Sequence, residues 1–170
     1  VVRINKILET DADISSKDNL VKINKGLGHL VFEDVSFRYY EGAQNVLCNL
    51  NFDIKPGETI GIIGSTGSGK STLINLLSRL IDVSEGRILL DCTDIRDIDL
   101  KELRSQFGFV PQHNVLFSGT VAENLRLGNK DASLDDLKRA AKAADIYDYL
   151  MDEPDQFESI VQQGGSNFSG

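Results

Sequence analysis

The sequence contains no tryptophan, a single methionine and only two cysteines, Cys48 and Cys92. These cysteines lie far apart and in no metal-ligand spacing, so we interpret them as free thiols of a reducing compartment. Aromatic residues make up 7% of the chain, and aliphatic side chains must therefore fill most of the core. No apolar run approaches the roughly 20 residues that cross a bilayer, and no signal-peptide pattern opens the chain. We expect these residues themselves to form one soluble globular domain.

Positive charge is also scarce, with 18 lysines and arginines against 26 acidic residues and a net charge of −8. Nonspecific binding to nucleic acid needs clustered lysine and arginine to displace counterions, so we expect no nucleic-acid partner. A bound nucleotide is not excluded, because backbone N–H groups hold phosphates without any net positive charge.

A glycine-rich stretch in the middle of the chain carries the main chemical signal. It fits the spacing GxxxxGK[ST] of a phosphate-binding loop, in which glycines let the backbone turn sharply and approach the phosphates. Lys70 is expected to reach the β- and γ-phosphates, and the Ser71 hydroxyl to ligate Mg²⁺. The predicted phosphate-binding residues are Gly64, Ser65, Thr66, Gly67, Ser68, Gly69, Lys70, Ser71 and Thr72.

The stretch is flanked by the elements that a phosphate-binding loop needs. Residues 59–63 are apolar without alternation, which is typical of a strand buried on both faces of a parallel sheet. Apolar residues then recur at helical spacing from Leu73 to Ile81, which predicts an amphipathic helix. Strand, loop and helix in this order are the context in which the motif is specific.

Other segments predict further strands and helices around this unit. Alternation over 46–54 predicts a half-buried antiparallel strand. Its apolar face is expected to carry Val46, Cys48, Leu50, Phe52 and Ile54. Further elements are expected at 30–37, 87–90, 100–105 (a helix) and 107–110. After Gln112 the pattern becomes helical, and Ser133 with Asp136 predicts a capping box.

Two residues outside the loop narrow the class of nucleotide-binding protein. Tyr39 lies on the antiparallel element upstream of the loop, where an aromatic ring can stack on adenine. Taken alone, a surface tyrosine is the simpler interpretation, and Tyr40 is a second, weaker candidate. Gln112 ends the last predicted strand, so its amide is placed to reach a metal ion or an attacking water at the carboxyl edge of the sheet.

Together these motifs resemble the ATP-binding domain of an ABC transporter, over nearly all of residues 29–170. Tyr39 is similar to the adenine-stacking A-loop residue, residues 64–72 to the Walker A loop, and Gln112 to the Q-loop glutamine. The resemblance implies ATP and Mg²⁺ as ligands. It also implies catalytic roles for Lys70 and Gln112, with Gln112 additionally at the metal ion.

The end of the chain carries a further part of the resemblance. Phe168, Ser169 and Gly170 are similar to the first three residues of the nucleotide-binding Leu-Ser-Gly-Gly-Gln signature, with phenylalanine in place of leucine. The segment 114–124 is similar to that of exporters, multidrug and lipid exporters in particular. The resemblance implies that these 170 residues stop before the Walker B aspartate, a catalytic glutamate and a switch histidine. We therefore expect this chain alone to bind ATP weakly and to hydrolyse it negligibly.

The resemblance also implies an α/β fold, with a P-loop NTPase core, an antiparallel β subdomain and a helical subdomain. The core sheet is expected to be incomplete, because the strands that follow the signature are absent. Residues 1–28 are expected to link to the last transmembrane helix of a parent protein. Residues 29–112 would form the antiparallel β subdomain and the first part of the core, and residues 113–170 the helical subdomain.

The implied function is that of an exporter's ATP-binding domain, which uses ATP binding and hydrolysis to power transport across a membrane. Its partners would be a transmembrane domain, of the same or another chain, and a second nucleotide-binding domain, at the cytoplasmic face of the cell membrane. Two alternatives stay open. One is an ABC ATPase with no transporter role, and the other is a degenerate partner subunit that binds nucleotide without hydrolysing it.

Overall fold

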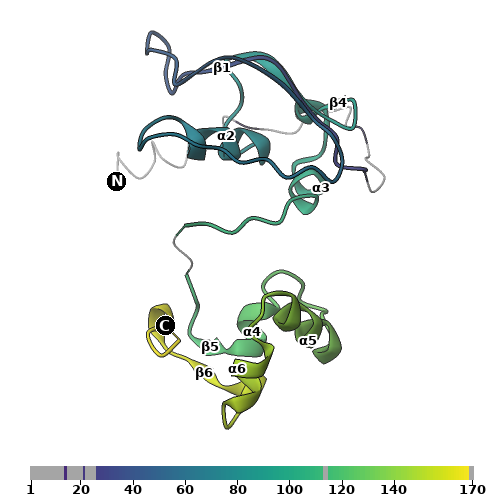
Figure 1. Cartoon of the computed structure of the whole chain (residues 1–170), viewed down its shortest axis with the longest axis vertical. Helices are drawn as coiled ribbons and strands as arrows, with labels where there is room; N and C mark the ends of the chain where they lie inside the picture. Colours follow the sequence, from purple (N-terminus) through teal and green to yellow (C-terminus); the bar gives the residue numbers. More distant parts are fainter. Residues whose placement is uncertain (1–13, 15–20, 22–25, 113–114, 169–170) are drawn as a thin grey trace, which may run out of the picture. The chain divides into compact units, whose positions relative to one another are not determined.

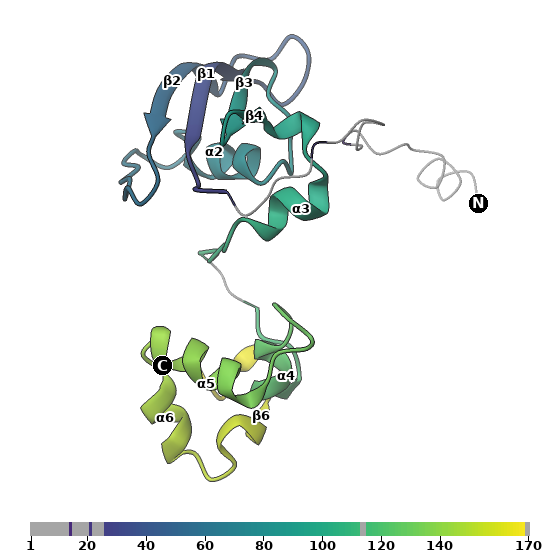
Figure 2. The ribbon, with the colours of Figure 1, turned by 90° about the vertical axis from the view of Figure 1, so that its right-hand side faces the viewer.

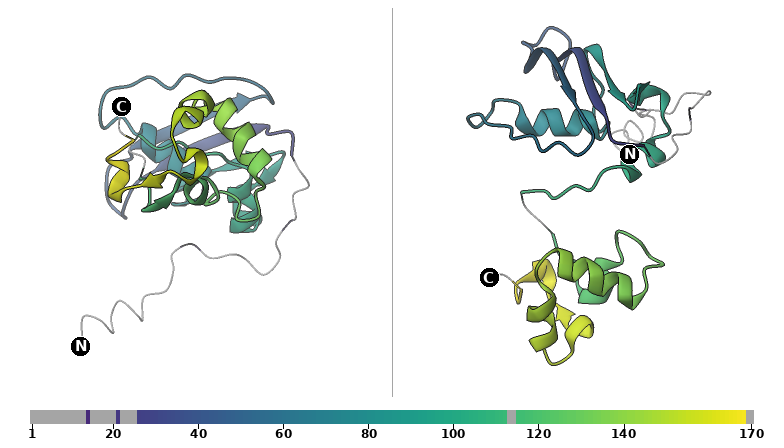
Figure 3. Two further views of the ribbon diagram at one scale, coloured as in Figure 1. Left: turned by 90° about the horizontal axis from the view of Figure 1, so that it is seen from below. Right: turned by 45° about the vertical axis from the view of Figure 1, so that its right-hand side comes forward.

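The computed structural model describes residues 14, 21, 26–112 and 115–168. The chain forms two compact units, Val1–Phe109 and Val110–Gly170, and each is described by itself. Figures 1 and 3 show both units. Most of the predicted linker at 1–28 lies outside the described residues, as do Ser169 and Gly170 of the predicted signature.

The first unit is built on a four-stranded antiparallel sheet with the strand order β2-β1-β3-β4 (Figure 2). Its elements are β1 (Leu30–Phe37), β2 (Leu47–Ile54), α2 (Lys70–Leu77), β3 (Glu85–Leu90), β4 (Thr93–Asp94), the 3₁₀ turn η1 (Ile95–Asp97) and α3 (Leu100–Ser105). The strands predicted at 30–37 and 87–90 and the helix predicted at 100–105 are confirmed.

The core of this unit lies between the sheet and α2. Phe32 and Val35 of β1 are buried, and Phe32 stacks on Phe52 of β2 with ring centroids 4.1 Å apart. Leu73 and Leu76 of α2 join the same cluster of buried side chains. One apolar face of α2 therefore packs on the sheet. The first residue of the helix, Lys70, directly follows the glycine-rich loop.

The apolar face of β2 differs from the predicted one at its start. Between Leu50 and Leu47, β2 contains one residue more than the opposite stretch of β1, and Asn49 takes a left-handed φ of 46°. Such a bulge shifts the side-chain alternation by one residue. Leu47 is consequently buried and Cys48 is exposed, which is the reverse of the prediction.

Helix α2 ends at Leu77, earlier than the predicted continuation to Ile81. Arg79 takes a left-handed φ of 48°, and the Leu80 N–H donates to the Asn75 carbonyl at 2.9 Å. This is the hydrogen-bond pattern of a helix that terminates through a left-handed residue, here an arginine in place of the usual glycine. Leu80, predicted to continue the apolar stripe, is 54% exposed as a result.

The two predicted strands of the parallel core, at 59–63 and 107–110, are not formed. Ile63 is 98% exposed and Val110 is 85% exposed. A buried strand needs neighbours that pair with its backbone and cover its faces, and no described strand of the chain pairs with either segment. The predictions of a buried strand at 59–63 and of a further strand at 107–110 are therefore wrong for the described structure, because these segments lack such neighbours.

The second unit is mainly helical, as predicted for the chain after Gln112. Its elements are β5 (Gly119–Thr120), α4 (Val121–Leu125), α5 (Leu134–Ala143), α6 (Tyr147–Asp152), η2 (Gln156–Glu158), β6 (Ile160–Val161) and η3 (Gln163–Gly165). The strands β5 and β6 pair antiparallel, and Leu137, Leu150 and Phe157 lie in its small core. No helix within 26–112 and 115–168 is long and apolar enough to span a membrane.

Helix α5 begins at the predicted capping box. The Asp136 N–H donates to the Ser133 hydroxyl oxygen at 3.2 Å, while the Ser133 N–H donates to the Asp136 carboxylate at 2.9 Å. Hydrogen bonds from the Ser133 hydroxyl and backbone, and from Arg139, lower the pKa of Asp136 to about 2. The carboxylate thus stays ionised over most of the pH range, at a helix end that favours negative charge.

Candidate functional site: the glycine-rich loop and the start of helix α2

The glycine-rich loop runs over residues 64–69 and leads directly into α2. The Ser68 N–H donates to the Ser65 carbonyl at 3.2 Å, which closes a turn within the loop. Gly67 and Gly69 take left-handed φ values of 85° and 88°. Residues with a Cβ are strained in this region, so the backbone path of the loop itself favours glycine at both positions.

Space around the loop adds a second requirement at two of its glycines. A Cβ on Gly69 would lie 2.7 Å from Cδ2 of Leu47, and one on Gly64 would lie 3.1 Å from Cβ of Ser68. Around Gly67 there is open space instead. Gly69 therefore sits tightly against β2, and Gly64 folds against the far side of its own loop, which fixes the loop relative to the sheet and the helix.

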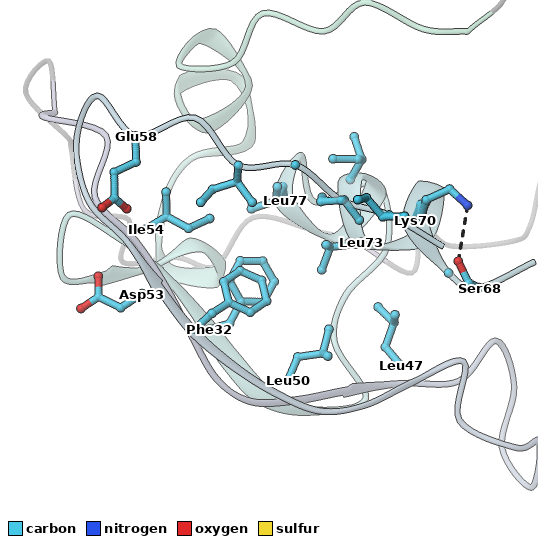
Figure 4. A pocket seen from close by; sticks show the side chains of 17 residues that line it. Phe32, Leu47, Leu50, Asp53, Ile54, Glu58, Ser68, Lys70, Leu73 and Leu77 are labelled. Carbon is cyan, nitrogen blue, oxygen red and sulfur yellow. Dashed lines mark hydrogen bonds between the residues drawn. The ribbon is translucent and has the colours of Figure 1, made fainter. Parts of the chain in front are cut away.

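The Lys70 side chain lies over the loop rather than extending into solvent. Its Nζ donates to the carbonyl oxygens of Gly64 at 2.7 Å and Ser65 at 2.8 Å, and approaches the Ser68 hydroxyl at 3.4 Å (Figure 4). An ammonium group held against two carbonyls has its charge fixed at the mouth of the loop. That placement is what a phosphate-binding lysine requires.

The first turn of α2 completes an anion-binding surface. Helix termini leave the first N–H groups without intrahelical partners and carry a positive end of the helix dipole. Gly69 at the N-cap makes no side-chain cap, and the first turn has no acidic residue. Ser71 is exposed there and Thr72 is 5% exposed. The start of α2 thus offers backbone donors and one exposed hydroxyl next in sequence to the loop that holds the Lys70 ammonium group.

Tyr39 is brought to the same place by the end of β1. Its hydroxyl hydrogen-bonds the Thr72 hydroxyl at 2.9 Å, and its ring meets Phe37 edge to face with centroids 4.9 Å apart. Tyr39 is 61% exposed, so its side chain is accessible to a flat ligand. Sequence reasoning missed the bond to Thr72, since nothing in residue spacing indicates it. The bond nevertheless favours Tyr39 over Tyr40 as the aromatic residue of this site.

The other predicted site residues belong to the second unit, and two of them, Ser169 and Gly170, are outside the described residues. Gln112 is exposed on an irregular segment and belongs to the second unit, whereas the loop belongs to the first. Phe168, next to the undescribed Ser169 and Gly170, packs edge to face on Tyr149 with centroids 6.3 Å apart. Of the predicted site residues, Tyr39 and residues 64–72 therefore lie together in the first unit, and Gln112 belongs to the second unit.

A cavity of about 710 Å³ lies beside the loop, between β2 and α2. Figure 4 shows Phe32, Leu47 and Leu50 of the sheet facing Leu73 and Leu77 of the helix across it. Its walls are mainly aliphatic and aromatic, and charged phosphates are costly to transfer to such surroundings. We therefore assign it to the incompletely filled core and not to nucleotide binding.

A divalent cation at the site would depend on oxygen ligands. Within the described ranges, no three histidine, cysteine, aspartate or glutamate residues are grouped closely enough to hold a metal ion. Mg²⁺ is usually bound through few protein ligands together with water and substrate phosphates. The exposed Ser71 hydroxyl at the start of α2 fits that type of site.

Comparison with known proteins decides the family. Residues 47–170 match the protein family described as ABC transporter. The chain belongs to the ABC transporter family. The predicted membership of the ABC transporter family is thereby confirmed, and the chain is part of an ABC-type ATP-binding domain.

Two relatives and one solved structure illustrate this ABC transporter assignment. The chain is 42% identical over 168 residues to the uncharacterized ABC transporter ATP-binding protein YfiB of Bacillus subtilis (strain 168), covering 99% of this chain and 29% of that protein. It is 41% identical over 150 residues to the ATP-dependent lipid A-core flippase of Methylobacillus flagellatus, covering 88% of this chain and 26% of that protein. A bacterial Atm1-family ABC exporter with ATP bound matches with a TM-score of 0.90 and 32% identity, covering 99% of this chain and 30% of that chain.

These matches confirm the predicted fold class. The chain has the ABC ATPase fold, with an antiparallel β subdomain and several helices. Its parallel core sheet is incomplete in the described structure. The chain spans less than a third of the length of these relatives.

Proposed function

We propose that this chain is the ATP-binding part of an exporter, in which ATP binding and hydrolysis power transport across a membrane. The observation that carries the proposal is the convergence of Lys70, the start of α2 and Tyr39. The ammonium group of Lys70 lies 2.7 Å from the Gly64 carbonyl, and the Tyr39 hydroxyl lies 2.9 Å from that of Thr72. A triphosphate and an adenine ring are the ligand parts that these two features suit.

Each residue of the site has a role in this proposal. The backbone N–H groups from about Thr66 to Thr72 bind phosphate oxygens at the positive end of the α2 dipole, while Lys70 neutralises the β- and γ-phosphates. Tyr39 stacks on adenine. Ser71 and Gln112 would hold Mg²⁺, which would supply neutralisation of the phosphate charge. Gln112 would also orient the attacking water through its amide.

We further propose the assembly in which this site works. Ser169 and Gly170 of the signature would face the nucleotide held by a second nucleotide-binding domain. The helical part of the chain, residues 113–170, would meet the transmembrane domain, and residues 1–28 would link the last transmembrane helix to the ATP-binding domain. Relatives named ATP-binding/permease proteins support a transmembrane partner, because their names combine both activities. The site would then lie at the cytoplasmic face of the membrane.

The isolated chain of 170 residues is proposed to bind ATP weakly and to hydrolyse it negligibly. Lys70 and Gln112 bind and position, but neither can act as the general base that activates water, since a lysine ammonium and an amide do not accept a proton readily. By the family resemblance, the carboxylate that would act as general base is a glutamate that comes after the signature in the sequence. Activity is therefore expected of the whole protein and not of this part.

The experiment measures ATP affinity and ATP turnover for three proteins: wild type, Lys70→Ala and Gln112→Ala. In the full-length protein, wild type should hydrolyse ATP, and both variants should lose turnover, Gln112→Ala with little change in ATP affinity. Lys130→Ala, at an exposed lysine of the second unit, is the control that should change neither. Binding without turnover by wild type would instead favour the degenerate partner subunit. Equal ATP affinity of wild type and Lys70→Ala would overturn the proposed site.

A further inference from the structure

The C-terminal end of α2 is held by two arginines that the nucleotide site does not use directly. Arg79 is 4% exposed, and its guanidinium donates to both carboxylate oxygens of Asp82, at 2.9 and 3.3 Å. It also donates to the Arg96 carbonyl at 3.4 Å, just after β4. A buried arginine held on both sides in this way fixes the chain where the helix ends.

Arg104 of α3 completes the arrangement from the other side. Its Nε donates to the Ser78 carbonyl at 3.1 Å, and its Nη2 donates to the Arg79 carbonyl at 2.9 Å. Both carbonyls lie at the negative end of α2, where backbone oxygens have no intrahelical partner. The planar guanidinium thus binds two backbone groups at once, and we call Arg79, Asp82 and Arg104 the arginine clamp.

The clamp joins two elements that each lead to a residue of the proposed site. Helix α2 begins with Lys70, and its eight residues span only about 12 Å, so a tilt at its end is transmitted to its start. Helix α3 is followed in sequence by the segment that ends at Gln112. The hydrogen bonds between α3 and the end of α2 therefore restrain the orientation of each helix relative to the other.

We propose that Arg104 is a positioning residue for ATP hydrolysis, which rests on the proposed function above. It acts by holding the end of α2 against α3, so that Lys70 at the start of α2 keeps its position over the glycine-rich loop. Charge alone does not give this effect. Lysine carries the same charge, but it lacks the two rigidly spaced nitrogens with which the guanidinium reaches both carbonyls at once.

The test uses Arg104→Gln in the full-length protein, with Lys101→Gln as the matched control. Lys101 is exposed on the same helix and its substitution removes the same charge. A small misplacement of catalytic groups costs up to about 100-fold, so we expect Arg104→Gln to lower kcat about tenfold with KM changed less than about twofold. Arg104→Lys should recover only part of the loss. Lys101→Gln should change neither constant.

Amide hydrogen exchange of α2 supplies a second measurement that needs no turnover. Arg104→Gln should speed exchange across α2, and Lys101→Gln should not, because only the first removes the bridge. Unchanged exchange in Arg104→Gln, or faster exchange without a fall in kcat, overturns the positioning role. If wild type itself hydrolyses no ATP, the proposed function fails, while exchange still decides whether the clamp holds α2. Arg79→Lys, which loses the fork to Asp82, should speed exchange in the same helix.

Discussion

Substituting alanine for Gly69 should destabilise the chain far more than the same change at Gly67, although both glycines share one backbone conformation. Their φ values are 88° and 85°. The difference lies in what surrounds them. At Gly69 the new Cβ would lie 2.7 Å from Cδ2 of Leu47 and 3.3 Å from Cγ1 of Val46, whereas at Gly67 it would meet open space.

The magnitude follows from two separate terms. Left-handed backbone costs a residue with a Cβ about 1–2 kcal/mol, and both variants bear this cost. Forcing an extra methyl group into a packed site costs about 1–3 kcal/mol more, and only Gly69→Ala bears that cost, because Leu47 is a buried core residue. We therefore expect a loss of about 1–2 kcal/mol for Gly67→Ala and about 2–5 kcal/mol for Gly69→Ala.

Urea unfolding of the two variants, followed by circular dichroism, measures both losses as changes in the free energy of unfolding. A third protein, Gly69→Ala combined with Leu47→Ala, removes the side chain that the new methyl group would strike. In that background Gly69→Ala should cost only the backbone term, so the two substitutions should be non-additive. The reasoning is refuted if Gly69→Ala and Gly67→Ala agree within about 0.5 kcal/mol, or if Leu47→Ala brings no relief.

Three further predictions concern the site and the second unit. Lys70→Ala should raise the Kd for a fluorescent ATP analogue at least about 100-fold, as expected for loss of a charged partner, with little change in thermal stability. Tyr39→Phe and Thr72→Val should be non-additive in the free energy of unfolding by about 0.5–1.5 kcal/mol, because each removes one side of the same hydrogen bond. Below pH 3.8 the helix capped by Ser133 should weaken. The pKa of Asp136 is lowered to about 2, so its stabilising contribution is present above 3.8 and is lost as pH falls through about 2. Asp136→Asn should remove this acid dependence, measured by helical circular dichroism.

Local features of the fold were predictable from the sequence because their causes are local. The capping box at Ser133 needs only residues that lie within one turn of each other, and the phosphate-binding loop needs its glycines and Lys70 in one short stretch. The antiparallel strands β1 and β3 also follow from their own apolar patterns. In each case the atoms that decide the structure are close together in the sequence.

Features that depend on distant partners were not predictable in the same way. Residues 59–63 have the composition of a buried strand, yet burial requires neighbouring strands that the segment itself cannot encode. The bulge at Asn49 arises from pairing with β1, and it moved Leu47 into the core in place of Cys48. The bridge from Arg104 to the end of α2 joins residues far apart in the sequence and has no motif.

This division explains why the loop keeps its form beside a segment that is not a strand. A phosphate-binding loop usually connects a buried strand to a helix. Here residues 59–63, which precede the loop, do not form a strand in the described structure. The contacts that shape the loop come from elsewhere: Lys70 holds the Gly64 carbonyl, Gly69 packs on Leu47, and Tyr39 reaches back to α2. Because these contacts all come from the loop, the helix and the antiparallel sheet, the geometry of the proposed phosphate site is built within the first unit. Burial of 59–63 would add rigidity to this site, and it would not create it.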